Sequence, residues 1–426
     1  MTLPPRADPT TAFQTQPLEF LATLHELHGD VFLTEIDGTP TVFCGGASGP
    51  RELFSAEREH LGIYNTNLVH DLFGAAIFNL RGAEHLAARK VLRSGLAKPR
   101  LLGYAPEAVR LARNHVAGWP PKPCDLYQAA RSLTMSACTR IILGIPDNDP
   151  DERELRHLFE TFIAGTCVPS DERYSRPEYW RARHAANSLR ALFRRRINAV
   201  RTAPGKDFLS HVVSYIDRIA ANRTGLPDHL LAVLVAMRET TASLVTWLCV
   251  ELARDDRAAG AVTHDAASFL ADPSMLVDWA AGPALRAALL EAERLHSPNT
   301  ISLRIVLSDC RIGGYDVLRG WHAAYSPSAN HLMPRLYDQP HRFCPTRFID
   351  GSGDQAPQLL TFGRGIHACP GKQLAELLVM ATASAVFAEH RLALIADVPT
   401  DLSYLPVKAP RTGIVVQLHR TSGRVA

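Results

Sequence analysis

The feature that most constrains this chain is one cysteine in a glycine-rich loop. Residues 361–371 read TFGRGIHACPG, and a helix with apolar periodicity is predicted to follow them. Gly363 and Gly365 permit backbone conformations that other residues avoid. Cys369 precedes a helix N-terminus, where free N–H groups and the nearby Arg364 favour a thiolate. A thiolate in such a loop is either a nucleophile or a metal ligand.

The other cysteines show no pattern that assigns them a site. They lack the clustered spacing of a zinc site and the dense pairing of a secreted disulfide scaffold, so we expect reduced thiols in a cytoplasmic protein. Residues 1–16 lack the basic start and apolar core of a signal peptide. No apolar run approaches the roughly 20 residues of a membrane helix. A net charge of +3 is too balanced for a dedicated nucleic-acid-binding protein.

Hydrophobic periodicity predicts a mainly helical protein with small β-sheets. No repeat, low-complexity tract or long linker marks a boundary, so we expect one domain over residues 1–426, with residues 1–14 loosely ordered. Residues 326–357 lack periodicity, and an irregular stretch that long usually has a function. The predicted helices cover residues 82–97, 105–117, 125–143, 149–165, 176–201, 208–221, 227–255, 274–295 and 371–390. The predicted strands cover residues 31–36, 40–43, 303–307, 310–312, 315–317, 392–395 and 413–418.

The segment around the cysteine resembles the haem-binding loop of the cytochrome P450 family. The residues that match that loop are Phe362, Gly363, Gly365, His367, Cys369 and Gly371. The resemblance covers residues 15–420 and implies the family's triangular, helix-rich fold, with haem b between a long distal helix and the cysteine loop. It implies that Cys369 is the axial thiolate of the haem iron, that Phe362 shields its sulfur and that His367 faces a haem propionate. The alternative interpretation is a buried cysteine in a tight turn.

Two distant segments match further motifs of the family. Glu291 and Arg294 lie one turn apart on a predicted helix, a spacing that solvated helices also produce often. Residues 345–348 resemble the family's Pro-x-Arg-Phe segment. The resemblance implies a buried cluster in which the Glu291 carboxylate pairs with Arg294 and Arg347. That cluster would lock the irregular segment under the haem and would perform no chemistry.

Three basic residues match positions at which the family binds the two haem propionates. Arg304 lies near the start of a predicted strand, at the place of the family's propionate arginine. His85 and Arg89 lie one turn apart on a predicted helix and match a His-x-x-x-Arg pair. With His367 they would give four donors for two carboxylates. Taken individually, each is equally consistent with a solvated surface residue.

The longest predicted helix contains residues 236–241, Ala-Met-Arg-Glu-Thr-Thr. They align with the family's Ala-Gly-x-Glu/Asp-Thr-Thr signature, in which Ala236 is a cofactor contact. The resemblance implies that Glu239 brings protons from solvent while the Thr240 hydroxyl hydrogen-bonds oxygen or positions a water. A mid-helix polar pair bonded to its own backbone is the alternative. Met237 replaces the family's usual glycine and Arg238 stands beside the acid, so both could alter oxygen access or proton entry.

The family's substrate-contacting and donor-contacting segments map to two further sets of residues. The substrate set is mostly small or aliphatic, which suits an apolar terpenoid, polyketide or fatty-acyl skeleton: Phe73, Ile77, Phe78, Asn79, Val168, Val233, Met237, Thr300 and Ile301. The basic set on the would-be proximal face comprises Arg89, Lys90, Arg93, Lys98, Arg100, Arg364 and Lys372. This second set is either a solvated surface or a docking site for a small acidic electron donor.

The sequence therefore predicts a cytoplasmic, bacterial-type monooxygenase of secondary metabolism that inserts one oxygen atom from O2 into an apolar small molecule. A separate ferredoxin or flavodoxin would supply the electrons. Met237 and Arg238 motivate an alternative within the same family, namely peroxide-driven oxidation, oxidative coupling, ring rearrangement or dehydration. A haem sensor without turnover is a third hypothesis, and the pair of Glu239 and Thr240 speaks against it.

Overall fold

The computed structural model describes residues 2–6, 17–119, 122–219, 225–349, 359–404 and 407–421. The chain divides into two compact units, which we describe one at a time. Unit 1 comprises Met1–Tyr64 and Leu290–Cys369, and unit 2 comprises Asn65–Leu289 and Pro370–Ala426.

The structure describes residues 2–6 of the N-terminal segment that we expected to be loosely ordered. The carbonyl oxygen of Thr2 accepts a hydrogen bond from the Asp316 N–H (2.8 Å), and the carbonyl oxygen of Pro5 accepts one from the Leu33 N–H (2.7 Å). These bonds tie residues 2–6 to the rest of unit 1. Met1 and residues 7–14 lie outside the described residues.

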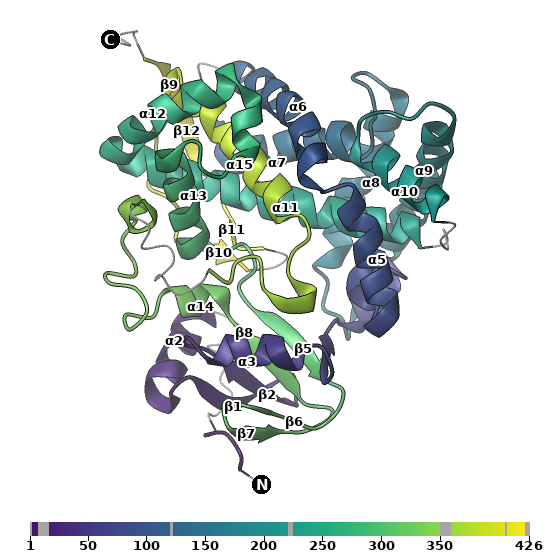
Figure 1. Ribbon diagram of the computed structural model, residues 1–426, viewed down its shortest axis with the longest axis vertical. Helices are drawn as coiled ribbons and strands as arrows, with labels where there is room; N and C mark the ends of the chain where they lie inside the picture. Colours follow the sequence, from purple (N-terminus) through teal and green to yellow (C-terminus); the bar gives the residue numbers. More distant parts are fainter. Residues whose placement is uncertain are drawn as a thin grey trace. The chain divides into compact units, whose positions relative to one another are not determined.

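Unit 1 is built on a five-stranded mixed sheet with the strand order β1–β2–β8–β5–β3. β2 and β8 pair in parallel, and the other neighbours are antiparallel. Asp37 and Gly38 both have positive φ, as in the type I′ turns that join twisted strands through two residues. The strands are β1 (Val31–Ile36), β2 (Thr39–Cys44), β3 (Leu61–Ile63), β5 (Ser302–Val306) and β8 (His322–Tyr325). The hairpin β6 (Cys310–Ile312) and β7 (Tyr315–Val317) belongs to the same unit, with the helices α2 (Pro17–His28), α3 (Gly49–Ala56) and α14 (Pro327–His331) (Figure 1).

Alternating side chains along these strands build two small cores. Phe32 and Phe43 stack at 5.5 Å in the core that α2 and α14 share with the sheet. Phe54 of α3 and Tyr325 of β8 meet edge to face at 5.0 Å in the other core. The second core matters for function because Tyr325 also lies beside the cysteine loop.

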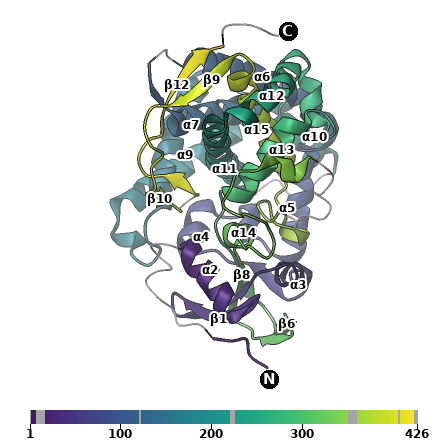
Figure 2. The same ribbon diagram turned by 90° about the vertical axis from the view of Figure 1, so that its left-hand side faces the viewer.

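Unit 2 is mainly helical, and α11 runs through its centre between α7 and α15. Its helices are α4 (Asn67–Phe73), α5 (Gly82–Ser94), α6 (Lys98–Ala117), α7 (Leu126–Ala137), α8 (Pro150–Thr166), α9 (Pro177–Thr202), α10 (Phe208–Arg218), α11 (Leu226–Arg254), α12 (Asp256–Ala271) and α15 (Lys372–Phe387), while α13 (Pro283–Leu295) continues into unit 1. Figure 2 shows β9 (His390–Leu394) and β12 (Val415–Arg420) side by side, and β4 (Cys124–Asp125) pairs with β12. A second small sheet pairs β10 (Leu402–Ser403) with β11 (Ala409–Pro410).

The helix α11 has the length and apolar composition of a membrane span. This corrects the expectation that no segment approaches such a span, because the apolar stretch of α11 is long enough although charged residues interrupt it. In this apolar stretch 78% is buried inside the protein, and core helices of soluble proteins share this length and composition. Within the described residues it is the only such helix.

Most predicted helices form with shifted ends, but the helix predicted over residues 274–295 is broken. A 3₁₀ turn covers Pro273–Val277, and α13 begins only at Pro283 because Gly282 has a φ of +65°. The helix α12 was missed because alanines occupy many of its positions, although its Asp255 cap is a sequence signal. The strand β8 was missed because its four residues are all buried and do not alternate.

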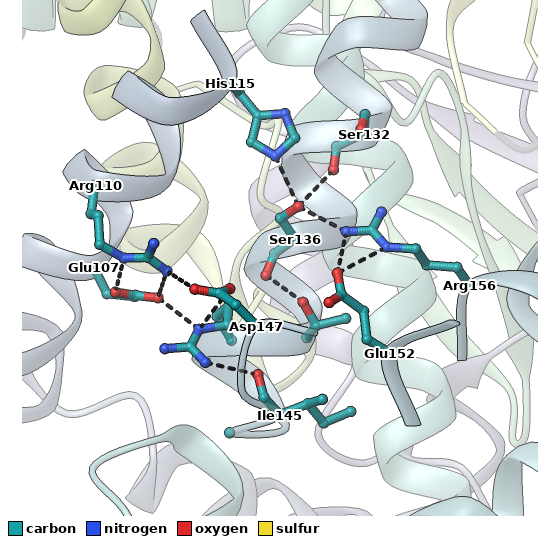
Figure 3. Close-up of polar contacts among 12 residues, drawn as sticks. Glu107, Arg110, His115, Ser132, Ser136, Ile145, Asp147, Glu152 and Arg156 are labelled. Carbon is teal, nitrogen blue, oxygen red and sulfur yellow. Dashed lines mark hydrogen bonds and ion pairs between the residues drawn. The ribbon is translucent and has the colours of Figure 1, made fainter. Parts of the chain in front are cut away.

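An ion-pair network connects α6 with the segment that follows α7 (Figure 3). A π-helical turn, Cys138–Ile142, extends α7 and carries Arg140. Glu107 accepts two hydrogen bonds from Arg110 (2.8 and 2.7 Å) and one from Arg140 Nε (3.0 Å). Arg110 and Arg140 lower the pKa of the Glu107 carboxyl. Because all three side chains are partly exposed, solvent screens this network and limits its contribution to stability.

Candidate functional site

Backbone hydrogen bonds within unit 1 shape the loop that carries Cys369. The Leu360 carbonyl oxygen accepts from the Gly363 N–H (2.9 Å), and the Phe362 carbonyl oxygen accepts from the Cys369 N–H (2.8 Å). A short 3₁₀ turn, Gly365–His367, lies between them. The loop therefore folds back on itself and presents an exposed cysteine shortly before α15.

The two loop glycines are required by conformation and by space. Gly363 and Gly365 have φ values of +61° and +68°, which L side chains adopt with strain. A Cβ atom on Gly363 would lie 3.0 Å from the Tyr325 hydroxyl oxygen, and one on Gly365 would lie 2.9 Å from Glu57 Oε2. A larger residue at either position would displace the loop.

Glu291, Arg294 and Arg347 lie in contact in unit 1. Arg294 donates two hydrogen bonds to the Glu291 carboxylate (2.7 Å each), and Arg347 Nε donates a third (3.1 Å). The side chains of Glu291 and Arg294 are completely buried. The Cys344 N–H also donates to Glu291 Oε1 (2.9 Å). These four donated hydrogen bonds compensate the buried Glu291 carboxylate for the loss of its hydration.

The remaining donors of Arg294 bind the irregular segment. Its Nη1 donates to the carbonyl oxygens of His331 (2.9 Å) and Pro340 (2.6 Å), and its Nη2 donates to that of Arg342 (3.1 Å). Three carbonyl oxygens of a segment without regular secondary structure thus accept their hydrogen bonds from the Arg294 guanidinium. Arg294 thus connects the end of α13 to the irregular segment.

Arg304 has a partner that the sequence analysis missed. Its Nε donates to Glu57 Oε1 (2.8 Å), and both side chains are almost completely buried. Its Nη1 donates to Ser302 Oγ (2.8 Å) and to the Leu303 carbonyl oxygen (3.0 Å). The charge of Arg304 is therefore already balanced by Glu57, which follows α3 in the sequence. No sequence motif marks Glu57, because 247 residues separate the two partners.

His85 and Arg89 lie on α5 in unit 2. His85 is buried, and Arg89 is partly buried. Burial, reinforced by the Arg89 charge, lowers the pKa of His85, so the ring is neutral at neutral pH and donates through one nitrogen. The sequence analysis expected four donors for the two haem propionates. In the structure, the charge of Arg304 is offset by Glu57, and a neutral His85 adds no charge.

Glu239 lies in a buried cluster of charges that joins α7, α8 and α11 within unit 2. Arg238 binds both Glu239 and Glu160. Arg131 lies 3.5 Å from Glu239 Oε2 and 3.2 Å from Glu160 Oε2. Glu239 is 4% exposed and Glu160 54% exposed, so the cluster runs from the helix interior to solvent. Tyr127 lies near the Glu239 carboxylate, and burial, reinforced by the Glu239 charge, raises the pKa of Tyr127 to about 12.

Thr240 and Ala236 share one face of α11, and Met237 does not. Ala236 is exposed and Thr240 partly exposed, whereas Met237 and the next threonine, Thr241, are buried. The Thr240 hydroxyl donates to the Ala236 carbonyl oxygen. This is the backbone bond that the alternative interpretation of the pair expected. The helix continues through this point without a break.

The predicted substrate residues fall in both units. In unit 2, Phe73 packs edge to face against Phe78 (5.0 Å) and against Phe162 (5.1 Å). The Asn79 amide is used by its own loop: Nδ2 donates to the Gly74 carbonyl oxygen (2.9 Å), and Oδ1 accepts from Asn65 (2.9 Å). The partly buried members of the set in this unit are Ile77, Val168 and Val233. In unit 1, Thr300 is buried and Ile301 partly buried.

A salt bridge ties α4 to the turn before α9 in unit 2. Asp71 accepts from Arg173 Nε (2.7 Å), from the Tyr179 hydroxyl (3.2 Å) and from the Tyr174 hydroxyl (3.3 Å). The Leu68 N–H donates to Ser170 Oγ (3.1 Å) in the same region. These contacts hold together two of the segments that the resemblance assigns to substrate.

The basic surface residues divide into paired and unpaired groups. Lys90, Arg93 and Lys98 are exposed on α5 and at the start of α6, and they form no ion pair with any residue that the structure describes. On α9, by contrast, Arg195 binds Asp151 (3.1 Å) at the start of α8. Arg195 of α9 is thus exposed to solvent and also connects α9 to α8 by an ion pair.

Comparisons with known proteins agree with this arrangement. A family profile described as Cytochrome P450 matches residues 9–412. Abscisic acid 8'-hydroxylase 3 of Oryza sativa subsp. indica is 24% identical over 422 residues, which cover 96% of this chain and 83% of the relative. Cytochrome P450 26B1 of Homo sapiens is 24% identical over 421 residues, which cover 93% of this chain and 82% of the relative. The solved structure "Retinoic acid bound cyanobacterial CYP120A1" has a TM-score of 0.84 and 24% identity, and the match covers 99% of this chain and 100% of that one.

Proposed function

Because this chain belongs to the cytochrome P450 family, we propose that it hydroxylates an isoprenoid carboxylic acid with O2 and electrons from a separate protein. The predicted family, its helix-rich fold, its monooxygenase chemistry and its haem cofactor are confirmed. The observation that carries the proposal is the loop of Cys369, in which two glycines with positive φ present the cysteine shortly before α15.

The residues present fit haem. In unit 1, positive φ at Gly363 and Gly365 shapes a loop on which Cys369 is exposed and available as a ligand. Bound through a cysteine thiolate, haem supplies the chemistry of O–O bond cleavage. In this proposal Cys369 holds the iron, while the other residues that would contact haem are Phe362, Gly371, His85, Arg89, Arg304 and His367.

The substrate class is inferred from the molecules named for the relatives. Abscisic acid and retinoic acid are both isoprenoid carboxylic acids, a narrower class than the sequence predicted. The packed rings of Phe73, Phe78 and Phe162 would supply an apolar wall for such a skeleton. A screen of haem spectral shifts should show binding of isoprenoid acids in preference to their methyl esters and to straight-chain fatty acids. Preference for the esters or for polyketides would reject this substrate class.

Proton handling is assigned to Glu239 and Thr240. Arg238 and Arg131 hold the Glu239 carboxylate, so Glu239 has to exchange these partners before it serves Thr240. We expect Glu239→Gln to lower turnover by roughly 10²–10⁴-fold, the usual contribution of a positioned acid. Thr240→Ala should divert electrons from product to peroxide, measured as product formed per electron consumed.

Thr241→Ala is the matched control for the threonine. Thr241 is the next residue of α11, but its hydroxyl is buried and has no hydrogen-bond partner in the described structure. It should leave the ratio of product to peroxide unchanged. Equal effects of the two substitutions would contradict a role specific to Thr240.

The cluster around Arg238 supports a second candidate reaction, peroxide-driven oxidation. The guanidinium of Arg238 is paired with the Glu239 carboxylate, and this pairing would slow the transfer of protons from solvent through Glu239. Product formed with peroxide alone, at a rate at least equal to that with O2 and an electron donor, would favour this candidate. The reverse order would support the monooxygenase reaction.

An acidic ferredoxin or flavodoxin is proposed to dock on the unpaired basic residues of α5 and α6. Because charge steers such encounters, Arg93→Glu combined with Lys98→Glu should slow donor-dependent reduction by roughly tenfold at low salt. The difference from wild type should shrink as salt rises. Arg194→Glu on α9 is the control, since Arg194 is equally exposed. An unchanged rate for the double variant would reject this docking face.

We also propose one domain and a cytoplasmic location. The chain passes between the two units at residues 64/65, 289/290 and 369/370, a threading that favours joint folding. The seven cysteines other than Cys369 are free thiols in the described structure, as is usual in a reducing compartment.

A further inference from the structure

The completely buried ring of His331 contacts the entrance of the cysteine loop. His331 is the last residue of α14 and has no solvent exposure. Its Nε2 lies 2.8 Å from the backbone nitrogen of Leu360. Its Nδ1 lies 3.2 Å from the Arg294 carbonyl oxygen and 3.4 Å from Ser297 Oγ. The sequence analysis did not single out this histidine.

These two contacts determine where the imidazole proton lies. A backbone N–H can only donate, so Nε2 must be the bare nitrogen that accepts from Leu360. The Arg294 carbonyl oxygen can only accept, so Nδ1 carries the proton. Burial, reinforced by the Arg294 charge, lowers the pKa of His331 to about 3, which keeps the ring neutral. Tyr337 closes the other side of the ring, edge to face at 6.2 Å.

The bond from His331 continues through the backbone to Cys369. The Leu360 N–H donates to the ring, and the Leu360 carbonyl oxygen, which belongs to the next peptide group, accepts from the Gly363 N–H (2.9 Å). The next hydrogen bond joins the Cys369 N–H to the Phe362 carbonyl oxygen (2.8 Å). The Phe362–Gly363 peptide group therefore links the two bonds, because its N–H donates to Leu360 and its carbonyl oxygen accepts from Cys369.

The next residue, Thr361, is held separately, by residues at the end of α13 and just after it. Thr361 Oγ1 donates to the Glu293 carbonyl oxygen (2.9 Å) and lies 2.9 Å from Ser297 Oγ. Ser297 also donates to the Glu293 carbonyl oxygen (2.9 Å). Thr361 is thus fixed by hydroxyl groups near the helix end, whereas the Leu360 amide is fixed by the imidazole.

We infer that His331 is a positioning residue for the axial cysteine: its bare Nε2 holds the Leu360 amide and thereby sets the position of the loop that presents Cys369. The inference rests on the proposed role of Cys369 as haem ligand. His331 itself touches neither substrate nor cofactor in this role.

Two amide substitutions separate the two nitrogens of the ring. In His331→Gln the side-chain oxygen reaches as far as Nε2 and can accept from Leu360, whereas His331→Asn reproduces only the donor near Arg294. In the full-length, haem-loaded protein, amide exchange at Leu360 should be about tenfold faster in His331→Asn, the order expected for loss of one buried hydrogen bond. His331→Gln should keep wild-type exchange. The ferrous–carbon monoxide spectrum should show a smaller thiolate fraction in the Asn variant only.

His322→Asn is the matched control. His322 is also buried in unit 1, and its ring packs on Tyr64 at 4.1 Å. It forms no hydrogen bond with the cysteine loop in the described structure, so exchange at Leu360 and the spectrum should stay as in wild type.

Three outcomes would overturn the inference. One is equal exchange and equal spectra for the Asn and Gln variants. Another is loss of protection in His331→Gln, which decides the question even if His331→Asn does not accumulate as folded protein. The third is an equal effect of His322→Asn. A wild-type protein that binds haem without a thiolate spectrum would instead reject the role of Cys369, and amide exchange would still test His331.

Discussion

Glu291→Gln should destabilise the protein by about 3–5 kcal/mol, the usual cost of removing one partner from a buried ion pair. The substitution keeps the shape of the side chain but leaves the charges of Arg294 and Arg347 without their carboxylate. Because a typical protein has only about 5–15 kcal/mol of stability in total, we expect a large fall in the midpoint of chemical unfolding. Little haem-loaded protein should accumulate.

Glu107→Gln is an unusually close control for this prediction. Glu107 is also bound twice by an arginine three residues later, Arg110, and once by a distant one, Arg140. The Glu107 side chain is 26% exposed, however, and Glu291 is completely buried. Solvent screening limits the Glu107 pairs to about 0–1 kcal/mol. If both substitutions shifted the unfolding midpoint equally, burial would not be what makes the Glu291 cluster important.

Cys369→Ser should abolish monooxygenase turnover while leaving the fold intact. The backbone bond that fixes this residue, from its N–H to the Phe362 carbonyl oxygen, does not depend on the side chain. A serine hydroxyl does not ionise at neutral pH and is a poor replacement for thiolate. The ferrous–carbon monoxide spectrum should lose the red-shifted Soret band of thiolate ligation, and product formation should fall to the level of a haem-free sample.

Cys167→Ser is the control for the cysteine, since Cys167 is the other cysteine with an exposed residue surface. It should retain both the band and turnover. Persistence of the thiolate band in Cys369→Ser would show that another residue binds the iron. Loss of the band in both variants, with unchanged unfolding, would contradict the assignment to Cys369 alone.

The parts of the site that lie within one short segment could be predicted from the sequence. The glycines and the cysteine of residues 361–371 act through local backbone geometry, so their pattern can be recognised from the sequence alone. The sequence did not identify which acidic residues of other elements pair with Arg304 and Arg238. Glu57 and Glu160 are ordinary acidic residues in sequence, and only folding brings them to those arginines.

Two pairs with the same Glu-x-x-Arg spacing show that the sequence alone does not predict which pair is buried. The pairs of Glu107 with Arg110 and of Glu291 with Arg294 have the same local geometry, because an α-helix always places such residues on one face. The sequence by itself predicted most of the long helices and the glycine-rich cysteine loop, since apolar periodicity and glycine conformation act over a few residues. Only the tertiary structure decided which glutamate is buried and that His331 meets Leu360, because burial and long-range hydrogen bonds depend on the path of the whole chain.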